Sequence, residues 1–357
     1  MFLTDIDVNK VADRTGMTLR CKNHDRPLFW IAYPKKKVKS KGRWFGTREE
    51  WMDFDARIDQ AEAGFDNTGY LCEGFPSFWC NLGPDVFAAF TGSELEFSET
   101  TSWAKFRVKD WRQEPPITFK RNSPIWQATE KFTLRSIERG HGRWITGTGD
   151  IHTNGDGLAA LRGPQELLTD LIDCPDEIKK RLRECFEAYR EIMETQFALT
   201  LKADGGFSSG WMNVLCRGRY TVTQNDFSCM VGPAMFDEFF KEYVEKEAAL
   251  LDFCIYHLDG PDAIRHTDSV CDAPHVNAVQ WVPGAGQKEQ VHWPDLLKHI
   301  QARGKGLWLY PSNLRDAETL MRLLKPEGCM YVMWCGSKEE AEAYIKLAET
   351  VFHTKIK

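Results

Sequence analysis

The carboxyl-terminal part of the chain repeats one pattern five times, and this repetition limits the folds available to it. Each repeat is a short apolar run, a few polar residues and then a stretch with helical periodicity. The apolar runs lie at 219–223, 253–256, 276–281, 306–310 and 329–334. Runs of this length are typical of buried strands, and helices between them place successive strands parallel. The pattern therefore predicts βα units around a parallel sheet.

Three earlier runs extend the series to eight candidate strands, at 28–33, 105–110 and 143–148. Eight βα units predict a (β/α)8 TIM barrel with an N-terminal elaboration. We expect residues 1–125 to form that elaboration, including the first barrel strands and loops that cover the mouth. Residues 126–357 would complete the barrel as one structural domain. An open doubly wound sheet would need a Gly-rich phosphate-binding turn after its first strand, and none follows 28–33.

Short sequence signals predict where several helices begin or break. Thr47 and Glu50 form a capping-box pattern that predicts a helix over 48–63. A helical tract from 164 to 202 should break at Cys174-Pro175, because the residue before proline disfavours helical backbone. Residues 65–125 are rich in Gly, Pro and aromatic residues, and we expect this segment to supply walls of the pocket.

Charge and composition exclude several classes of protein. The net charge of −6 leaves no basic excess to offset phosphates, which argues against a nucleic-acid partner. No apolar run approaches the roughly 20 residues that span a bilayer, and the first residues lack the cations of a signal peptide. Eleven cysteines occur without a CxxC pair. These features predict a cytoplasmic protein that keeps its thiols reduced and has no membrane partner.

Polar residues follow most of the predicted strands. In a barrel these positions converge on one mouth, where the chemistry takes place. The set comprises Asp150, His152, Asn225, Asp226, His257, Asp259, Gln280, Trp281, Tyr310 and Cys335. A single aspartate after a strand is often only a helix cap, and that alternative stays open for Asp150, Asp226 and Asp259. Imidazole, carboxylate and thiolate are all zinc ligands, so His257, Asp259 and Cys335 are candidates for a metal site.

Residues 143–354 resemble the uroporphyrinogen decarboxylase superfamily, TIM barrels that include cobalamin-dependent methyltransferases. The similar segments are LRGPQELLTDLIDCPDEIKKRL, QNDFSCMVGPAMFDEFFKEY, YHLDGPDAIRH and VNAVQWVPGAGQ. The methyltransferase branch binds zinc through His-x-Cys and a distant Cys. His257 and Cys335 match two of these ligands, and Asp259 replaces the first Cys. The arginine-rich motif of the decarboxylases themselves is not found near the N-terminus.

The resemblance implies a methyltransferase that moves a methyl group between a small-molecule substrate and a corrinoid (cobalamin) cofactor. We expect no cobalamin-binding domain in this chain, so the corrinoid would be held by a partner protein; a homodimer is compatible with the resemblance. The expected catalytic residues are Asp150, His152, Asp226 and His257. Asn225, Gln280, Trp281 and Tyr310 would bind substrate, and His257, Asp259 and Cys335 would bind zinc.

Two alternatives remain open from the sequence. The first is a metal-free decarboxylase or lyase of a small aromatic or carboxylated compound, with Asp226 and His257 as general acid and base. The second is a protein that only binds a tetrapyrrole or corrinoid. This second function would leave the clustered Asp and His residues without a purpose.

Overall fold

A sheet of seven strands organises the computed structural model, which describes residues 5–37 and 46–356. The strand order is β2-β1-β13-β12-β11-β10-β9. All neighbours are parallel except β1 and β2, which are antiparallel. The strands are β1 (Leu28–Pro34), β2 (Thr68–Cys72), β9 (Tyr220–Gln224), β10 (Phe253–Asp259), β11 (Ala278–Val282), β12 (Gly306–Leu309) and β13 (Cys329–Trp334).

A second parallel pair, β3 (Ser77–Trp79) and β6 (Ile145–Gly147), lies beside this sheet. Thr148, directly after β6, donates its hydroxyl to the hydroxyl oxygen of Thr221 in β9 at 3.3 Å. No strand ladder among the described residues joins the pair to the sheet, so the sheet is not closed. Two short antiparallel hairpins complete the strands: β4 (Leu95–Phe97) with β5 (Ser102–Ala104), and β7 (Phe207–Ser208) with β8 (Cys216–Arg217).

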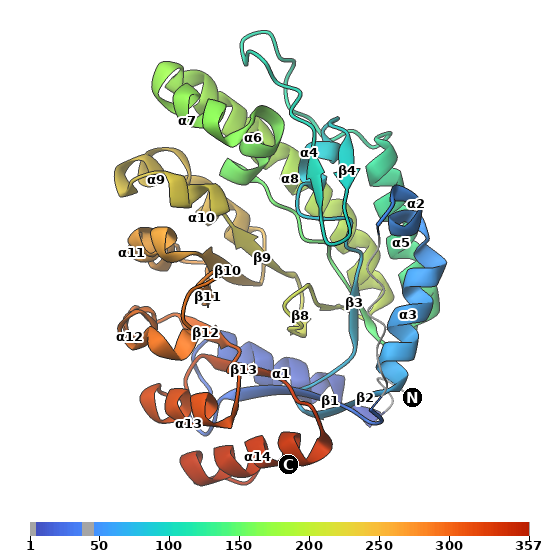
Figure 1. The fold of residues 1–357 in the computed structure, drawn as a ribbon, viewed down its shortest axis with the longest axis vertical. Helices are drawn as coiled ribbons and strands as arrows, with labels where there is room; N and C mark the ends of the chain where they lie inside the picture. Colours follow the sequence, from blue (N-terminus) through green and yellow to red (C-terminus); the bar gives the residue numbers. More distant parts are fainter. Residues whose placement is uncertain (1–4, 38–45, 357) are drawn as a thin grey trace.

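Most of the helices lie around the outside of the strands (Figure 1). The α-helices are α1 (Val8–Leu19), α2 (Arg48–Met52), α3 (Phe54–Asp66), α4 (Val86–Phe90), α5 (Pro124–Gly140), α6 (Asn154–Arg162), α7 (Pro164–Asp173), α8 (Pro175–Ala203), α9 (Pro233–Phe239), α10 (Lys241–Ala249), α11 (Thr267–Asp272), α12 (Pro294–Ala302), α13 (Leu314–Leu323) and α14 (Lys338–Phe352). Short 3-10 helices are η2 (Asp226–Met230), η3 (Pro261–His266) and η4 (Gln290–His292). Within the described residues, no helix is long and apolar enough to cross a membrane.

The repeated units after residue 219 are confirmed, and so is the break between α7 and α8 at Cys174. The capping box of Thr47 and Glu50 is also present. The helix that it begins is shorter than predicted, because Asp53 interrupts it and accepts a hydrogen bond from the backbone N–H of Ala56 to begin α3.

The predicted strand at 105–110 is wrong. This segment crosses the end of α6, where the backbone N–H groups of Arg107 and Val108 both donate to the carbonyl of Leu161. Its alternating pattern does not mark a buried face, since Phe106 is 60% exposed. The strands that were missed are β2, β3, β4, β5, β7 and β8. Those with two or three residues, such as β3, are too short to show a period.

Successive residues of the sheet strands face two different buried clusters. In β10, Cys254, Tyr256 and Leu258 pack with the surrounding helices. Phe253 and Ile255 point to the opposite face and join a separate inner cluster. This alternation is the two-residue period of a strand, and it decides which side chains can reach a site inside the ring of strands.

The inner face of the sheet is filled by a segment that precedes β9. Met212, Val214 and Leu215 of this segment are buried in the inner cluster. The indole N–H of Trp308, in β12, donates to the carbonyl of Met212 at 3.2 Å. Trp211, at the start of the segment, contacts the ring of His257 edge-on, with the ring centroids 5.4 Å apart. The segment therefore supports the carboxyl end of β10 from inside.

Candidate active site

The site begins at the carboxyl ends of β6 and β9. His152 follows β6, and its Nε2 lies 3.1 Å from an oxygen of Asp150. The amide nitrogen of Gln224, the last residue of β9, lies 2.9 and 2.8 Å from the two ring nitrogens of His152. The same amide nitrogen donates to Asp226 at 3.1 Å. Two predicted catalytic residues, His152 and Asp226, thus both lie against Gln224, a residue that was not predicted.

Asp156, in the first turn of α6, is a second residue that was not predicted. Its carboxylate accepts the backbone N–H groups of Asp226 at 2.9 Å and Phe227 at 2.7 Å. This contact fixes the start of η2 and brings a second carboxylate beside Asp226. Burial and the neighbouring charge of Asp226 raise the pKa of Asp156 to about 7. Burial likewise raises the pKa of Asp226 to about 6, with added repulsion from Asp259 and Asp150.

The surroundings of His152 favour its charged form, whereas those of Asp156 and Asp226 disfavour the charged carboxylates. Burial opposes a charge on its ring, but Asp150, Asp156 and Asp226 together outweigh burial and raise the pKa of His152 to about 10. The ring therefore carries a proton at neutral pH and is the positive centre of an otherwise acidic cluster.

His257 is held as a neutral imidazole. Burial lowers its pKa from the usual value. Its Nδ1 lies 2.5 Å from Oε1 of Gln280, a carbonyl-type oxygen that can only accept a hydrogen bond. Nδ1 therefore carries the proton, and the lone pair of Nε2 is available to a ligand. Gln280 thus fixes the tautomer of His257, the role usually taken by the outer partner of a metal-binding histidine.

Two sets of donor atoms converge in this region. The set of Asp226, His257 and Asp259 has donor atoms that all lie within 4.8 Å of one another, and so does the set of His152, Asp156 and Asp226. Asp226 belongs to both sets, and its Oδ1 is buried without a hydrogen-bond partner among the described residues. An unpartnered carboxylate oxygen beside a neutral imidazole nitrogen fits a cation such as zinc.

Cys335 is not part of either set. Along β13, Met330 and Val332 face the inner cluster, whereas Tyr331 and Met333 face the helices. Cys335 continues the second series and is buried in the cluster that packs against the helices. Burial, and then the nearby Glu340 at the start of α14, raise the pKa of its thiol to about 12. Among the described residues, Asp226 rather than Cys335 is grouped with His257 and Asp259.

Trp281 also lies outside the site, because its position in β11 turns its side chain toward the helices. It is fully buried on the helix-facing side of β11, and its ring contacts Trp293 edge-on, with the centroids 5.2 Å apart. This position leaves no face of the indole for a substrate. Gln280, one residue earlier, points inward to His257.

The two remaining predicted substrate residues lie at the edge of the cluster. Asn225 is buried against α6, where a methyl group on Gly155 would lie 2.5 Å from its Oδ1. Tyr310 is half-buried beside Trp308, with the ring centroids 5.6 Å apart. Burial, with the charges of Glu289 and Asp259, raises the pKa of Tyr310 to about 12, so its hydroxyl stays protonated.

Residues 150–155 read Asp-Ile-His-Thr-Asn-Gly, which matches the Asp-x-His-x-x-Gly pattern of cobalamin-binding segments. The expectation that the corrinoid lies on a partner therefore cannot rest on the absence of this pattern. In the structure, the ring of His152 is enclosed by Asp150, Gln224 and Asp156, which leaves it poorly placed to bind cobalt.

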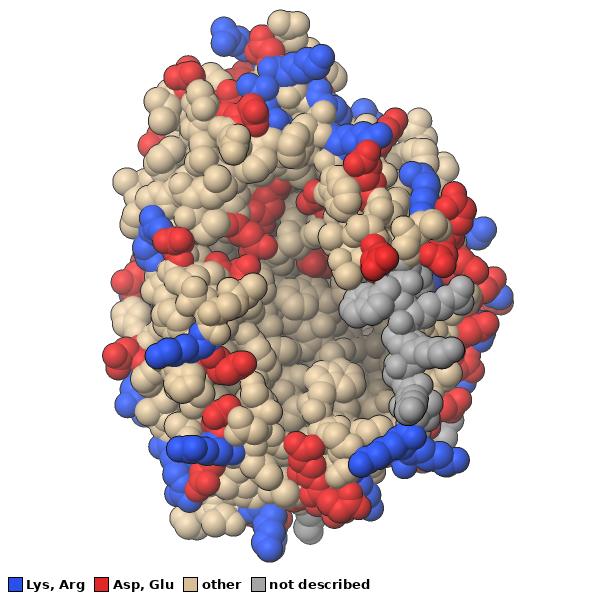
Figure 2. Space-filling view, viewed as in Figure 1, with Lys and Arg blue, Asp and Glu red and all other residues tan. Residues whose placement is uncertain are grey.

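A cavity of about 550 Å³ opens at the set of His152, Asp156 and Asp226. It is lined by Pro84, Asp85, Trp103, Ala104, Phe106, His152, Asp156, Ala159, Ala160, Pro164, Asp226, Phe227 and Met230. Several of these residues come from 65–125, so this segment supplies part of the wall of this cavity. Figure 2 shows one face of the molecule hollowed at its centre, with acidic side chains in the upper wall of the hollow.

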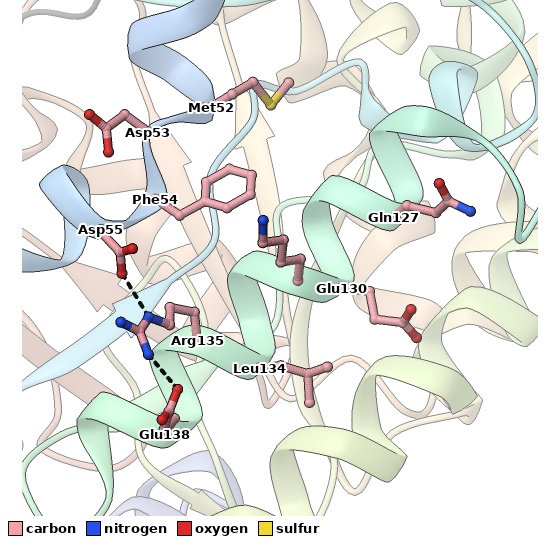
Figure 3. Close-up of a pocket in the computed structure, with 10 residues that line it drawn as sticks. Met52, Asp53, Phe54, Asp55, Gln127, Glu130, Leu134, Arg135 and Glu138 are labelled. Atoms are coloured by element: carbon pink, nitrogen blue, oxygen red, sulfur yellow. Dashed lines mark hydrogen bonds and ion pairs between the residues drawn. The ribbon is translucent and has the colours of Figure 1, made fainter.

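A second groove, of about 480 Å³, lies on the outside of the molecule between residues 52–55 and α5 (Figure 3). Arg135 is paired there with Asp55 at 2.7 Å and with Glu138 at 2.6 Å. The residues that line it belong to neither donor set, and we take this groove to be an ordinary feature of the helical surface.

Comparison with known proteins supports the fold. Neither a protein-family model nor a curated protein sequence matches the chain. Among solved structures, the chain is similar to a methyltransferase from Methanosarcina mazei, with a TM-score of 0.60 and 11% sequence identity. The similarity covers 96% of this chain and 99% of the methyltransferase. At this identity the likeness shows a shared fold, with strands and helices in the same arrangement along almost the whole of both chains.

Proposed function

We propose that this protein is an enzyme with a (β/α)8 barrel that transfers a methyl group between a small molecule and a corrinoid held by a partner protein. The observation that carries the proposal is the convergence of Asp226, His257 and Asp259 at the carboxyl ends of β9 and β10. The fold shared with a methyltransferase gives independent support. The hollow of Figure 2 would be the face that the corrinoid approaches.

In this proposal Asp226, His257 and Asp259 hold a zinc ion. When bound, zinc would act as a Lewis acid toward a substrate oxygen or sulfur. Gln280 keeps the proton of His257 on Nδ1, so the lone pair of Nε2 would be available to bind the metal. Asp156 fixes the backbone of Asp226 and so positions its carboxylate. His152 holds a proton among three carboxylates and can return it to a leaving group.

The decarboxylase alternative has less support. A carboxylated substrate needs a cation to bind it, as arginine does in bidentate pairs. No lysine or arginine is among the residues that line the cavity, all of which belong to the described part of the chain. His152 is the single basic group there, and its charge is already offset by aspartates.

Metal content and methyl transfer test the proposal together. Protein purified without chelator should contain about one zinc per chain, and His257→Ala should lose it. With a reduced corrinoid protein and a methyl donor, the absorption spectrum should change to that of the methylated corrinoid. A metal-free preparation with full activity would contradict the zinc site. A corrinoid spectrum that stays constant with every class of methyl donor would contradict methyl transfer.

A further inference from the structure

The cavity beside the site has an apolar outer part. Trp103 is 44% exposed, Phe106 60% and Met230 45%, although large apolar side chains usually avoid such exposure. All three line the same cavity. Trp103 is held in place by its indole N–H, which donates to Glu96 at 3.0 Å. Exposed aromatic groups that surround a concave site are typical of ligand binding.

The inner end of the cavity is acidic. Asp85, Asp156 and Asp226 line it, with His152 as the single basic group. One oxygen of Asp85 accepts the backbone N–H of Ala104 at 2.9 Å, and within the described chain its other oxygen accepts no hydrogen bond. The Oδ1 atom of Asp226 is buried and also lacks a partner among the described residues. Two carboxylates of the cavity therefore keep an oxygen that accepts no hydrogen bond from the described part of the chain. The oxygen of Asp226 is the one assigned to zinc in the proposed function, which leaves that of Asp85 for a ligand.

From this combination we infer that the cavity binds a small organic cation of the alkylammonium class. The charged centre would lie near Asp85 and Asp156, and its methyl groups would contact the rings of Trp103 and Phe106. Aromatic faces attract such cations through their quadrupole, and carboxylates attract them by charge. An anionic ligand would meet three carboxylates and no lysine or arginine. The volume of about 550 Å³ is in the range of small-molecule sites, roughly 300–1,000 Å³.

The inference rests on the proposed function, because it names the class of methyl donor. Loss of a methyl group breaks the C–N bond and leaves its electron pair on nitrogen, while the reduced corrinoid supplies the pair for the new bond. The product is a neutral amine.

A matched pair of ligands tests the inference on the whole protein. Choline and 3,3-dimethylbutan-1-ol have nearly the same shape, but only choline is charged. We expect choline to bind at least about tenfold more tightly in calorimetric titration. Asp85→Asn keeps an acceptor for the backbone N–H of Ala104. It should weaken the binding of choline by about five- to tenfold without changing the affinity for the alcohol. Trp103→Leu should weaken the binding of choline as well.

Glu130→Gln, in the separate groove of Figure 3, is the control and should bind choline like the wild type. The inference is overturned if both ligands bind equally, if neither binds, or if Asp85→Asn leaves the affinity for choline unchanged. Its failure is distinct from that of the proposed function. Methyl transfer from a neutral donor without choline binding would contradict this inference alone, whereas choline binding without any methyl transfer would contradict the proposed function alone.

Discussion

At the scale of single residues, the structure and the resemblance differ in which residues would bind zinc. The resemblance implies Cys335 as a zinc ligand, whereas the structure groups Asp226 with His257 and Asp259. We expect Asp226→Asn to weaken zinc binding by at least about tenfold, because the amide has lost the negative charge that zinc favours. Cys335→Ala should leave the zinc content unchanged. Zinc measured in both purified variants decides the matter, and zinc lost only from the Cys335 variant would contradict the structure.

A partly buried carboxyl outside the two donor sets gives a test by pH. Asp204, after α8, accepts the backbone N–H of Thr146 at 3.0 Å. Burial raises its pKa from 3.8 to about 7. The folded state therefore holds a proton that the unfolded chain has lost, so stability falls as the pH rises from about 4 to 7. Asp204→Asn keeps the acceptor and removes the titration.

Above pH 7, Asp204→Asn should be more stable than the wild type by on the order of 2 kcal/mol, since one pKa unit corresponds to about 1.4 kcal/mol and residual solvation reduces the full effect. Near pH 4 the two proteins should be equally stable. Urea unfolding at several pH values measures this difference. A difference that does not vary with pH would show that Asp204 is not the titrating group.

At the scale of secondary structure, the sequence predicted the elements that repeat and missed those that do not. The units after residue 219 have clear periods, and β10 to β13 formed as expected. β3 was missed because three residues carry no period. The faces of the strands were harder to predict, because one residue of register moves a side chain to the opposite side. For this reason Trp281 and Cys335 were expected inside but face the helices.

The candidate site was predicted where it lies on strand ends and missed where it comes from other elements. His257, Gln280 and Asp226 were found because they follow apolar runs. Asp156 was missed because it belongs to the first turn of a helix, where acidic residues are common for other reasons. Trp211 was missed because nothing in a Gly-rich connection indicates that it enters the ring of strands.

The segment that carries Trp211 supplies a prediction at this scale. Its indole covers the ring of His257, and burial lowers the pKa of that histidine. We expect Trp211→Ala to admit water and to raise the pKa of His257 toward its usual value of about 6.5. Titration of the histidine signals by nuclear magnetic resonance measures the change. Trp334→Ala, at a tryptophan that is 66% exposed, is the control and should leave the pKa of His257 as it is.

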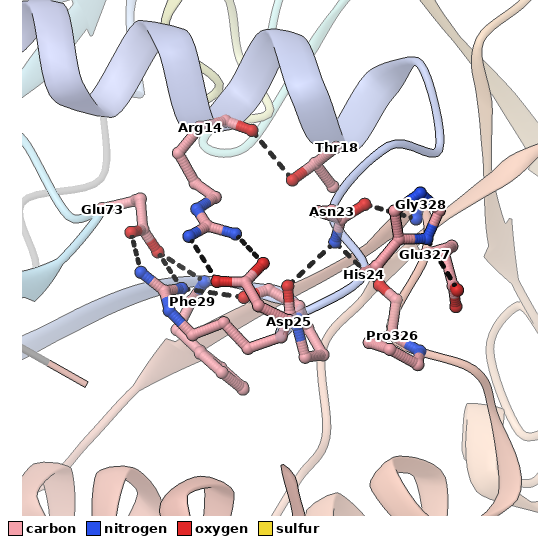
Figure 4. Close-up of polar contacts among 12 residues, drawn as sticks. Arg14, Thr18, Asn23, His24, Asp25, Phe29, Glu73, Pro326, Glu327 and Gly328 are labelled. Atoms are coloured by element: carbon pink, nitrogen blue, oxygen red, sulfur yellow. Dashed lines mark hydrogen bonds and ion pairs between the residues drawn. The ribbon is translucent and has the colours of Figure 1, made fainter. Parts of the chain in front are cut away.

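At the scale of the whole molecule, a buried ion pair ties the start of β1 to the end of β2 (Figure 4). Arg26 donates to both carboxylate oxygens of Glu73, at 3.0 and 2.6 Å, and Glu73 also accepts the backbone N–H of Phe29 at 2.9 Å. Both side chains are less than 10% exposed. The pair lies at the opposite end of β1 from residues 35–37, in the region that α1 covers. It therefore holds together segments that belong to the first and second strands of the fold.

Glu73→Gln should lower the free energy of unfolding by about 3–5 kcal/mol, because it leaves the buried charge of Arg26 without a counterion. The neighbouring pair of Arg14 and Asp25, at 2.6 Å, gives a matched control, since Asp25 is half-exposed. Arg14→Met should cost no more than about 1 kcal/mol. The double variant Arg26→Met with Glu73→Leu should regain most of the loss, because it removes both charges and retains apolar volume. Chemical unfolding of all four proteins measures these differences. Equal losses in Glu73→Gln and Arg14→Met would mean that burial does not set the strength of the pair, and that the two ends of β1 and β2 are held by packing alone.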